Sequence, residues 1–226
     1  MARITLLFVL LSWLAACQTS TGVPHPVAVD QALLDDVSES ARAEIDSARR
    51  ARDSASDAVA VAERDFEAAK QRVALAKSDV EVARSKADRA REAVNLARKG
   101  TDQDLEQANH NLEQAQREFE AARGLVAVRE KEVALARARM ELEKERHELA
   151  EAQLELVKAR AVEGIERPAA DAVDVAAHAA AVREQETQVR LAEVKKDAAE
   201  REVQVATERH EQEFGAIKEE ARDERR

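Results

Sequence analysis

Aromatic residues, glycine, proline and cysteine are all scarce in this chain. Of its 226 residues only 2% are aromatic, five are glycine, three are proline, one is cysteine (Cys17) and none is tyrosine. The single tryptophan, Trp13, lies in an apolar N-terminal run, so few bulky side chains remain for a deep core. This composition excludes a compact globule with a large core and favours long helices.

Charge is abundant and of both signs. Charged residues make up 36% of the chain, acidic and basic residues are interleaved, and the formal net charge is −10. An acidic, mixed surface repels both nucleic acid and anionic lipid. We therefore expect no nucleic-acid partner.

The N-terminus has the organisation of an export signal. Arg3 gives a positively charged start, residues 4–14 form an almost unbroken apolar run, and small residues precede Cys17. The run is too short for a membrane-spanning helix, which needs about 20 apolar residues, but suits a signal peptide.

The end of this segment, Leu14-Ala15-Ala16-Cys17, resembles the lipobox of bacterial lipoproteins. The resemblance covers residues 1–17 and implies that 1–16 are a signal peptide, cleaved before Cys17. It also implies that Cys17 carries a diacylglyceryl thioether and an acylated amino group, and several acyl chains hold a protein stably on a membrane. In that family Gln18, where inner-membrane lipoproteins have Asp, implies the outer membrane, facing the periplasm. The alternative is an ordinary secretory leader that ends in a cysteine by chance.

Residues 17–29 have no helical period. Gly22, Pro24 and Pro26 predict an extended, flexible tether between the lipidated cysteine and the folded part. Asp30 then follows as a candidate N-cap, and the helical domain is expected over 30–226.

The helical domain has a heptad period that can be counted. A first helix over about 30–99 carries alanine at nine successive heptad positions, namely Ala41, Ala48, Ala55, Ala62, Ala69, Ala76, Ala83, Ala90 and Ala97. Four residues after these alanines lie mostly larger apolar residues: Ile45, Val59, Phe66, Val73, Val80 and Val94. Alternation of large residues with alanine predicts a coiled-coil seam in which neighbouring helices approach closely.

Two further helices are expected, over about 102–163 and 168–223. Gly100 and Gly164 suit helix ends, residues 101–104 suit an N-cap, and Pro168 suits a first turn. The second helix repeats the seam and adds a third apolar stripe, which predicts more than one neighbour: Val128, Leu135, Leu142, Leu149 and Leu156. We therefore predict an all-α fold, a long antiparallel coiled coil, as a three-helix up-down-up bundle. The alternative is a two-helix hairpin with a separate third helix.

Eight polar residues fall at positions that this register would bury: Arg52, Arg129, Glu143, His147, His178, Gln185, Lys196 and His210. Reflecting the helices about their turns puts Arg52, His147 and Gln185 at similar heights. Either these residues form a polar layer that fixes register and topology at some cost in stability, or their long side chains reach outward to water. The functional alternative is a pH-sensitive or partner-binding notch, because histidine titrates near pH 6.5.

Signs of catalysis are missing from the sequence. The five histidines form no HExxH motif and there is no second cysteine, no phosphate-binding glycine loop and no nucleophile elbow. We expect no enzyme activity, no catalytic residue, no metal, no cofactor and no small-molecule substrate.

Three function classes stay open. The first is an envelope structural spacer or scaffold, lipid-anchored in the periplasm. The second is an interaction module of an envelope transport, secretion or motility complex, since the helices resemble the hairpins of periplasmic adaptor proteins without their β domains. The third is a periplasmic holdase chaperone. Partners would be the membrane, through the lipid on Cys17, and either a second copy of the chain or another helical protein, since an alanine-rich seam buries little area per residue.

Overall fold

The computed structural model describes residues 26, 28–163 and 165–223, with side chains described up to residue 215. The predicted signal peptide, Cys17 and most of the tether lie outside these residues. The described elements, all helical, are η1 (Gln31–Asp36), α1 (Glu39–Ala97), α2 (Asp102–Val162), α3 (Pro168–Asp171) and α4 (Val175–Asp223). The all-α prediction is confirmed.

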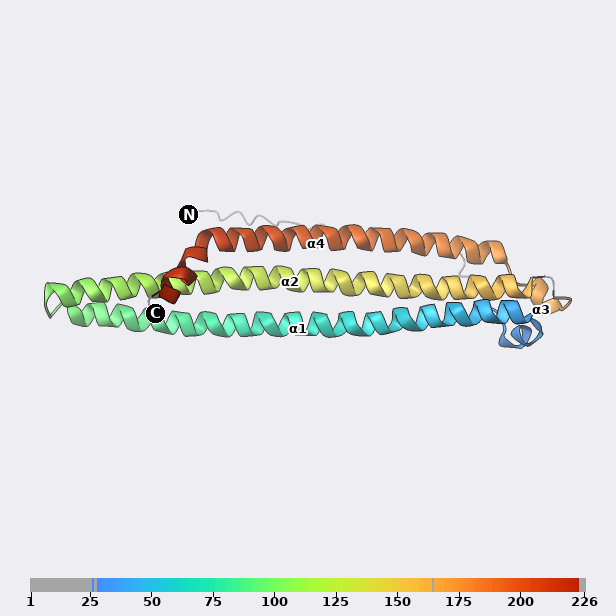
Figure 1. Cartoon of the computed structure of the whole chain (residues 1–226), viewed down its shortest axis with the longest axis horizontal. Coiled ribbons are helices and arrows are strands. Elements are labelled where there is room, and N and C mark those ends of the chain that lie inside the picture. Colours follow the sequence, from blue (N-terminus) through green and yellow to red (C-terminus); the bar gives the residue numbers. More distant parts are fainter. Residues whose placement is uncertain (1–25, 27, 164, 224–226) are drawn as a thin grey trace, which may run out of the picture.

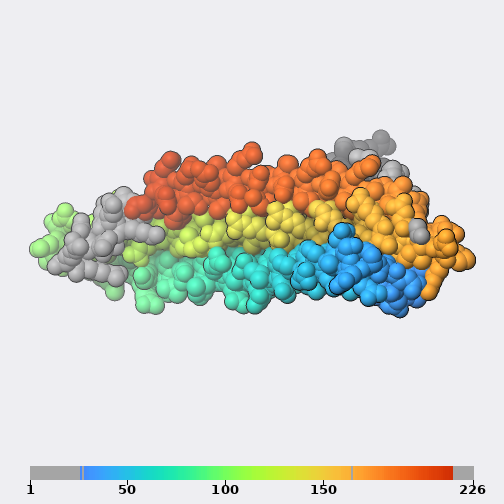
Figure 2. All heavy atoms as spheres, turned by 45° about the vertical axis from the view of Figure 1, so that its right-hand side comes forward, coloured from blue at the N-terminus to red at the C-terminus, as the bar shows by residue number. Residues whose placement is uncertain are grey.

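The three long helices run up, down and up in one layer, with α2 in the middle (Figure 1). α2 packs along both α1 and α4, whereas α1 and α4 make no comparable contact within the described residues. The space-filling view likewise shows α2 between its two neighbours (Figure 2). The helices are therefore antiparallel as predicted, and the bundle is flat rather than triangular.

The seam between α1 and α2 is the alanine heptad. Its buried members on α1 are Ile45, Ala62, Ala69, Ala76, Ala83 and Val94. Ion pairs cross the seam on both sides, among them Lys77 to Glu130 at 3.2 Å and Lys86 to Glu118 at 3.2 Å. Each exposed pair contributes little, but together they favour one register of the hairpin.

The second face of α2 explains its central place. Val128, Leu142 and Leu156, from the third apolar stripe, are buried, and on α4 Val182 and Ala192 are buried. Because α2 is apolar on two nearly opposite faces, it can bury both only between two helices. The prediction of more than one neighbour is confirmed.

Helix starts differ from the sequence prediction at two places. The first helix was expected from residue 30, but Asp30 caps η1, and Ser38 caps α1 by accepting a hydrogen bond from the Ala41 N–H at 3.2 Å. The third was expected to run unbroken from Pro168, but α3 ends at Asp171. α4 begins anew at Val175, where the Asp174 carboxylate accepts from the Ala177 N–H at 2.9 Å. Nearby polar residues compete as caps, and tertiary packing selects among them.

The end of the layer that carries α3 holds the best-packed core. Val29, expected as the last residue of the tether, is buried there and donates its N–H to the Glu155 carboxylate at 3.2 Å. The other buried members are Leu33, Leu34, Val37, Ile45, Leu154, Ala159, Val162 and Ala170. The N-terminal segment is therefore fixed to α2 before α1 begins. No described helix has a stretch long and apolar enough to cross a membrane.

Candidate functional site

The structure brings His147 and Gln185, two of the three polar residues of the predicted layer, to one height, whereas the Lys144–Glu63 ion pair sets a register of α1 on α2 that leaves Arg52 about two turns away. On α2, His147 Nε2 lies 3.5 Å from the Glu151 carboxylate, and Gln185 of α4 donates to Glu148 at 2.9 Å. On α1, hydrogen bonding and charge pairing with Asp53 raise the pKa of Arg52, and Glu151 adds a weaker contribution. His147 and Gln185 thus lie together beside Glu148 of α2, and Arg52 pairs with Asp53 of its own helix instead of joining them.

This layer leaves buried polar atoms without protein partners. They are Nδ1 of His147, Oε1 of Gln185 and Nε2 of His178, which lies two turns before Gln185 on α4. His178 is only 2% exposed. A buried polar atom without a hydrogen bond costs about 1–3 kcal/mol, so these unpaired atoms lower the stability of this part of the bundle.

The other polar residues at seam positions do find partners. Arg129 pairs with Glu132 at 2.6 Å, Arg146 with Glu143 at 2.9 Å, and Lys196 with Asp197 at 2.9 Å. All of these side chains are at least partly exposed. Their charged ends reach water while their stems cover the seam, as the outward-reaching alternative predicted.

An acidic groove of about 560 Å³ lies between α2, α4 and the N-terminal residues Pro26 and Ala28, beside His147 and Gln185. Five carboxylates line it: Glu145, Glu148, Glu151, Glu155 and Glu184. Burial, and then the charge of Glu148, raise the pKa of Glu145. The groove therefore disfavours further negative charge and would attract a cationic group.

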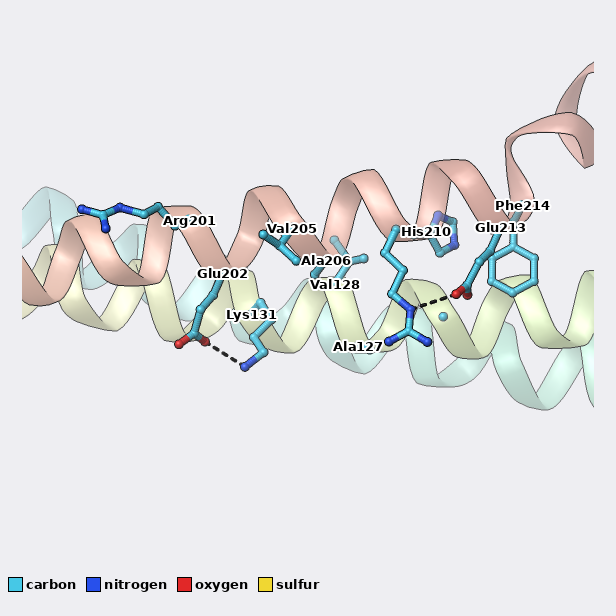
Figure 3. Close-up of a pocket in the computed structure, with 12 residues that line it drawn as sticks. Ala127, Val128, Lys131, Arg201, Glu202, Val205, Ala206, His210, Glu213 and Phe214 are labelled. Carbon is cyan, nitrogen blue, oxygen red and sulfur yellow. Dashed lines mark hydrogen bonds and ion pairs between the residues drawn. The ribbon is translucent and has the colours of Figure 1, made fainter.

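A second groove between the same two helices is apolar and has a volume of about 610 Å³. Figure 3 shows Val205, Ala206 and Phe214 of α4 facing Ala127 and Val128 of α2, with the Lys131–Glu202 pair beside them. Its lining is mostly hydrocarbon, so it would accept an apolar or amphipathic partner.

Gly124 shapes the far end of this apolar groove. His210 lies against α2 with Nε2 3.0 Å from the Ala121 carbonyl oxygen, and its ring lies 5.3 Å from that of Phe214. A Cβ on Gly124 would meet both rings at 3.0 Å. The heptad analysis identified His210 but missed Gly124 and Phe214, and a glycine in a helix interior was the available signal.

Neither groove has the arrangement of a metal centre, because no three His, Cys, Asp or Glu side chains among the described residues could hold an ion together. Cys17, the predicted lipidation site, lies outside the described residues. No protein-family model, curated protein or solved structure matches the chain.

Proposed function

We propose that this chain is a lipid-anchored periplasmic coiled-coil protein that acts as a non-catalytic spacer or scaffold of the cell envelope. The observation that carries the proposal is the extended layer of three antiparallel helices. α2 has 61 residues and is packed along both sides by antiparallel helices, giving a rod of about 90 Å at ~1.5 Å per residue. A rod of this kind holds its two ends at a fixed separation.

The ends of the rod have different surroundings. The N-terminal segment enters at the end where Val29, η1 and α3 pack, and the Gly100 turn lies at the opposite end. An anchor on Cys17 would thus attach the well-packed end to the membrane and direct the α1–α2 turn away from it. Because α1 and α2 pack against each other up to the turn, the distal end is stiff without a globular domain.

Metabolic labelling with palmitate tests the anchor. The wild-type chain should incorporate palmitate and fractionate with the outer membrane, whereas Cys17→Ser should do neither. Ser20→Cys in the Cys17→Ser background serves as a matched control, because it restores a thiol outside the lipobox. Labelling of that control, or none of the wild type, would reject the lipoprotein assignment.

Lengthening the rod tests the spacer. Duplicating residues 91–97 in α1 together with 107–113 in α2 adds one matched heptad to each helix and about 10 Å to the hairpin. Cryo-electron microscopy of cell sections should then show a separation between the anchoring membrane and the next envelope layer that is larger by about this amount. An unchanged separation in cells that contain the longer protein in normal amounts would reject the spacer role.

The apolar groove favours a second candidate, an interaction module of an envelope complex. Val205 is 64% exposed at the rim of the groove, although it is a large apolar side chain. A photoreactive residue in place of Val205 should then cross-link one envelope protein that the same probe at Ser56, an exposed position on α1, does not reach. Equal capture at both positions would leave the scaffold role as the better account.

A further inference from the structure

Helix α1 carries an apolar stripe on the side away from its seam. The stripe consists of Val61, Leu75, Val82 and Leu96, whose exposed fractions are 48%, 64%, 56% and 71%. They share one heptad position, two residues after Val59, Val73, Val80 and Val94 of the seam. On α2 the same position carries Val128, Leu142 and Leu156, which are buried in the structure. The stripe on α1 thus occupies the same heptad position as the second buried face of α2.

The stripe is confined to the distal part of α1. Ser40, Ser47 and Ser54 occupy the same heptad position earlier in the helix, and Leu96 lies one residue before its end. The apolar part therefore spans residues 61–96, or about 50 Å. Large apolar side chains at regular spacing over this length indicate a helical partner.

We propose that two copies of this chain associate through these stripes, antiparallel, about a two-fold axis beside Ser78. In this register Val61 packs against Leu96 of the second copy, and Leu75 against Val82. Ala68 lies opposite Arg89, so that the one charged residue at this heptad position between Val61 and Leu96 meets a small one. The stripe is self-complementary because its residues are spaced symmetrically about residues 78–79, which a two-fold interface requires.

The charges on one flank of the stripe favour this orientation. Arg64 and Glu92 are exposed, and neither takes part in an ion pair within the described part of the chain. They occupy one heptad position on the same flank of the stripe, so the apolar register places Arg64 opposite Glu92 of the second copy, twice by symmetry. A parallel pair would instead place Arg89 against Arg89 and leave Arg64 and Glu92 far apart, which disfavours it.

The dimer would extend the layer to six helices, with α4 at both outer edges. The starts of the two α1 helices would lie about 120 Å apart, at opposite ends. If each chain is anchored as proposed above, dimerisation converts a rod held at one end into a tie between two anchoring points. The association itself does not depend on the lipid, so the tests below and the palmitate test can fail independently.

Single cysteines, each introduced in the Cys17→Ser background so that the native thiol cannot cross-link, test the axis in cells that make the full-length chain. Ser78→Cys lies beside the two-fold axis and should form a disulfide-linked dimer on mild oxidation. Ser47→Cys lies at the stripe's heptad position but faces no α1 residue in the antiparallel register, so it should form no disulfide-linked dimer. Cross-linking at Ser47→Cys would indicate a parallel pair, and absence of cross-linking at Ser78→Cys would count equally against the proposal.

Charge exchange tests the register. In sedimentation equilibrium of the full chain in detergent, Arg64→Glu and Glu92→Arg should each raise the dimer dissociation constant roughly tenfold, because each creates two like-charge contacts. The double variant should return it to within about threefold of the wild type. No rescue by the double variant would overturn the register.

Apolar contacts are tested by Leu75→Asp, which should abolish the dimer. Its matched control is Val194→Asp on α4, where Val194 is similarly exposed at 67% and lies outside the stripe. Circular dichroism should show unchanged helix content in both variants, because both positions face water in the single chain. A dimer that survives Leu75→Asp, or is lost equally in Val194→Asp, would reject the stripe as the interface.

Discussion

Gly124 and Gly215 are both glycines within helices, but their surroundings differ. Glycine normally lowers helix stability by about 1 kcal/mol relative to alanine. At position 124 an added Cβ would lie 3.0 Å from atoms of His210 and Phe214, whereas at position 215 it would meet nothing within 4 Å. Gly124 therefore allows α4 to approach α2, and Gly215 has no packing reason of this kind.

Alanine substitution separates these two cases. Gly215→Ala should raise the free energy of unfolding by about 0.5–1 kcal/mol, because it removes backbone entropy from the unfolded chain without a clash. Gly124→Ala should give no gain or a loss, because the two rings must shift and the His210 hydrogen bond to Ala121 weakens. Urea denaturation followed by circular dichroism measures both, and an equal gain at the two positions would show that the rings move freely.

At the level of elements, the turn between α1 and α2 is held by a capping box. The Thr101 hydroxyl accepts from the Asp104 N–H at 3.3 Å, and the Asp104 carboxylate accepts from the Thr101 N–H at 3.0 Å. Hydrogen bonds from the Thr101 side chain and then its backbone lower the pKa of Asp104. The charged carboxylate thus favours the folded turn.

This pKa shift has a definite sign for stability. A carboxyl with a lower pKa in the folded chain contributes stability above its unfolded pKa, near pH 4, and loses it as pH falls through the folded pKa. Asp104→Asn should therefore melt at a lower temperature than the wild type at pH 7, and the difference should shrink below about pH 4. Asp102→Asn, in the same turn but outside the capping box, is the control. A difference independent of pH would contradict the assignment.

The two-faced character of α2 can be tested on its α4 side. Leu142 is 4% exposed, and Leu142→Ala should cost about 2–5 kcal/mol of unfolding free energy through lost burial and a cavity. Leu191 of α4 is 51% exposed, and the same substitution there should change stability by no more than about 0.5 kcal/mol. Chemical denaturation measures both. Equal small effects would mean that α4 is not packed on α2 in solution.

Heptad patterns show why the helices were predictable and their arrangement only in part. The alanine repeat identifies the seam of α1 because period and burial coincide, and Ile45 and Val94 are buried as expected. The angle between the two packing faces of α2 decides whether the bundle is triangular or flat, and a heptad position specifies that angle too coarsely. The start of α1 was misplaced because Asp30 and Ser38 are both good caps.

The candidate site was predictable only in part. Reflecting the helices about their turns predicted one height for Arg52, His147 and Gln185, which holds for His147 and Gln185, but the stagger of α1 on α2 shifts Arg52 by about two turns. The two grooves depend on the stagger between α2 and α4, which is set by contacts far apart in sequence, such as Lys131 with Glu202. The unpaired Nε2 of His178 follows from the same stagger.

At the scale of the whole molecule, stability is spread along the rod. Outside the core near α3, the seam consists mostly of alanine and valine, so each heptad adds a small, similar amount of buried area. Contacts between α1 and α2 depend on matched positions, as the ion pairs Lys77–Glu130 and Lys86–Glu118 show. The α1–α2 hairpin can therefore be lengthened without loss of stability only if both helices are lengthened by the same amount.

Heptad duplication tests this coupling directly. Duplicating 91–97 in α1 alone, or 107–113 in α2 alone, should lower the melting temperature, because the extra turns lack a partner and the tip loses its register. Duplicating both should restore it to the wild-type value or slightly above, because the added heptads pack against each other. The two effects should thus be strongly non-additive. Thermal unfolding followed by circular dichroism measures all four proteins, and additive losses would mean that the tip of the hairpin does not hold the matched antiparallel register seen in the structure.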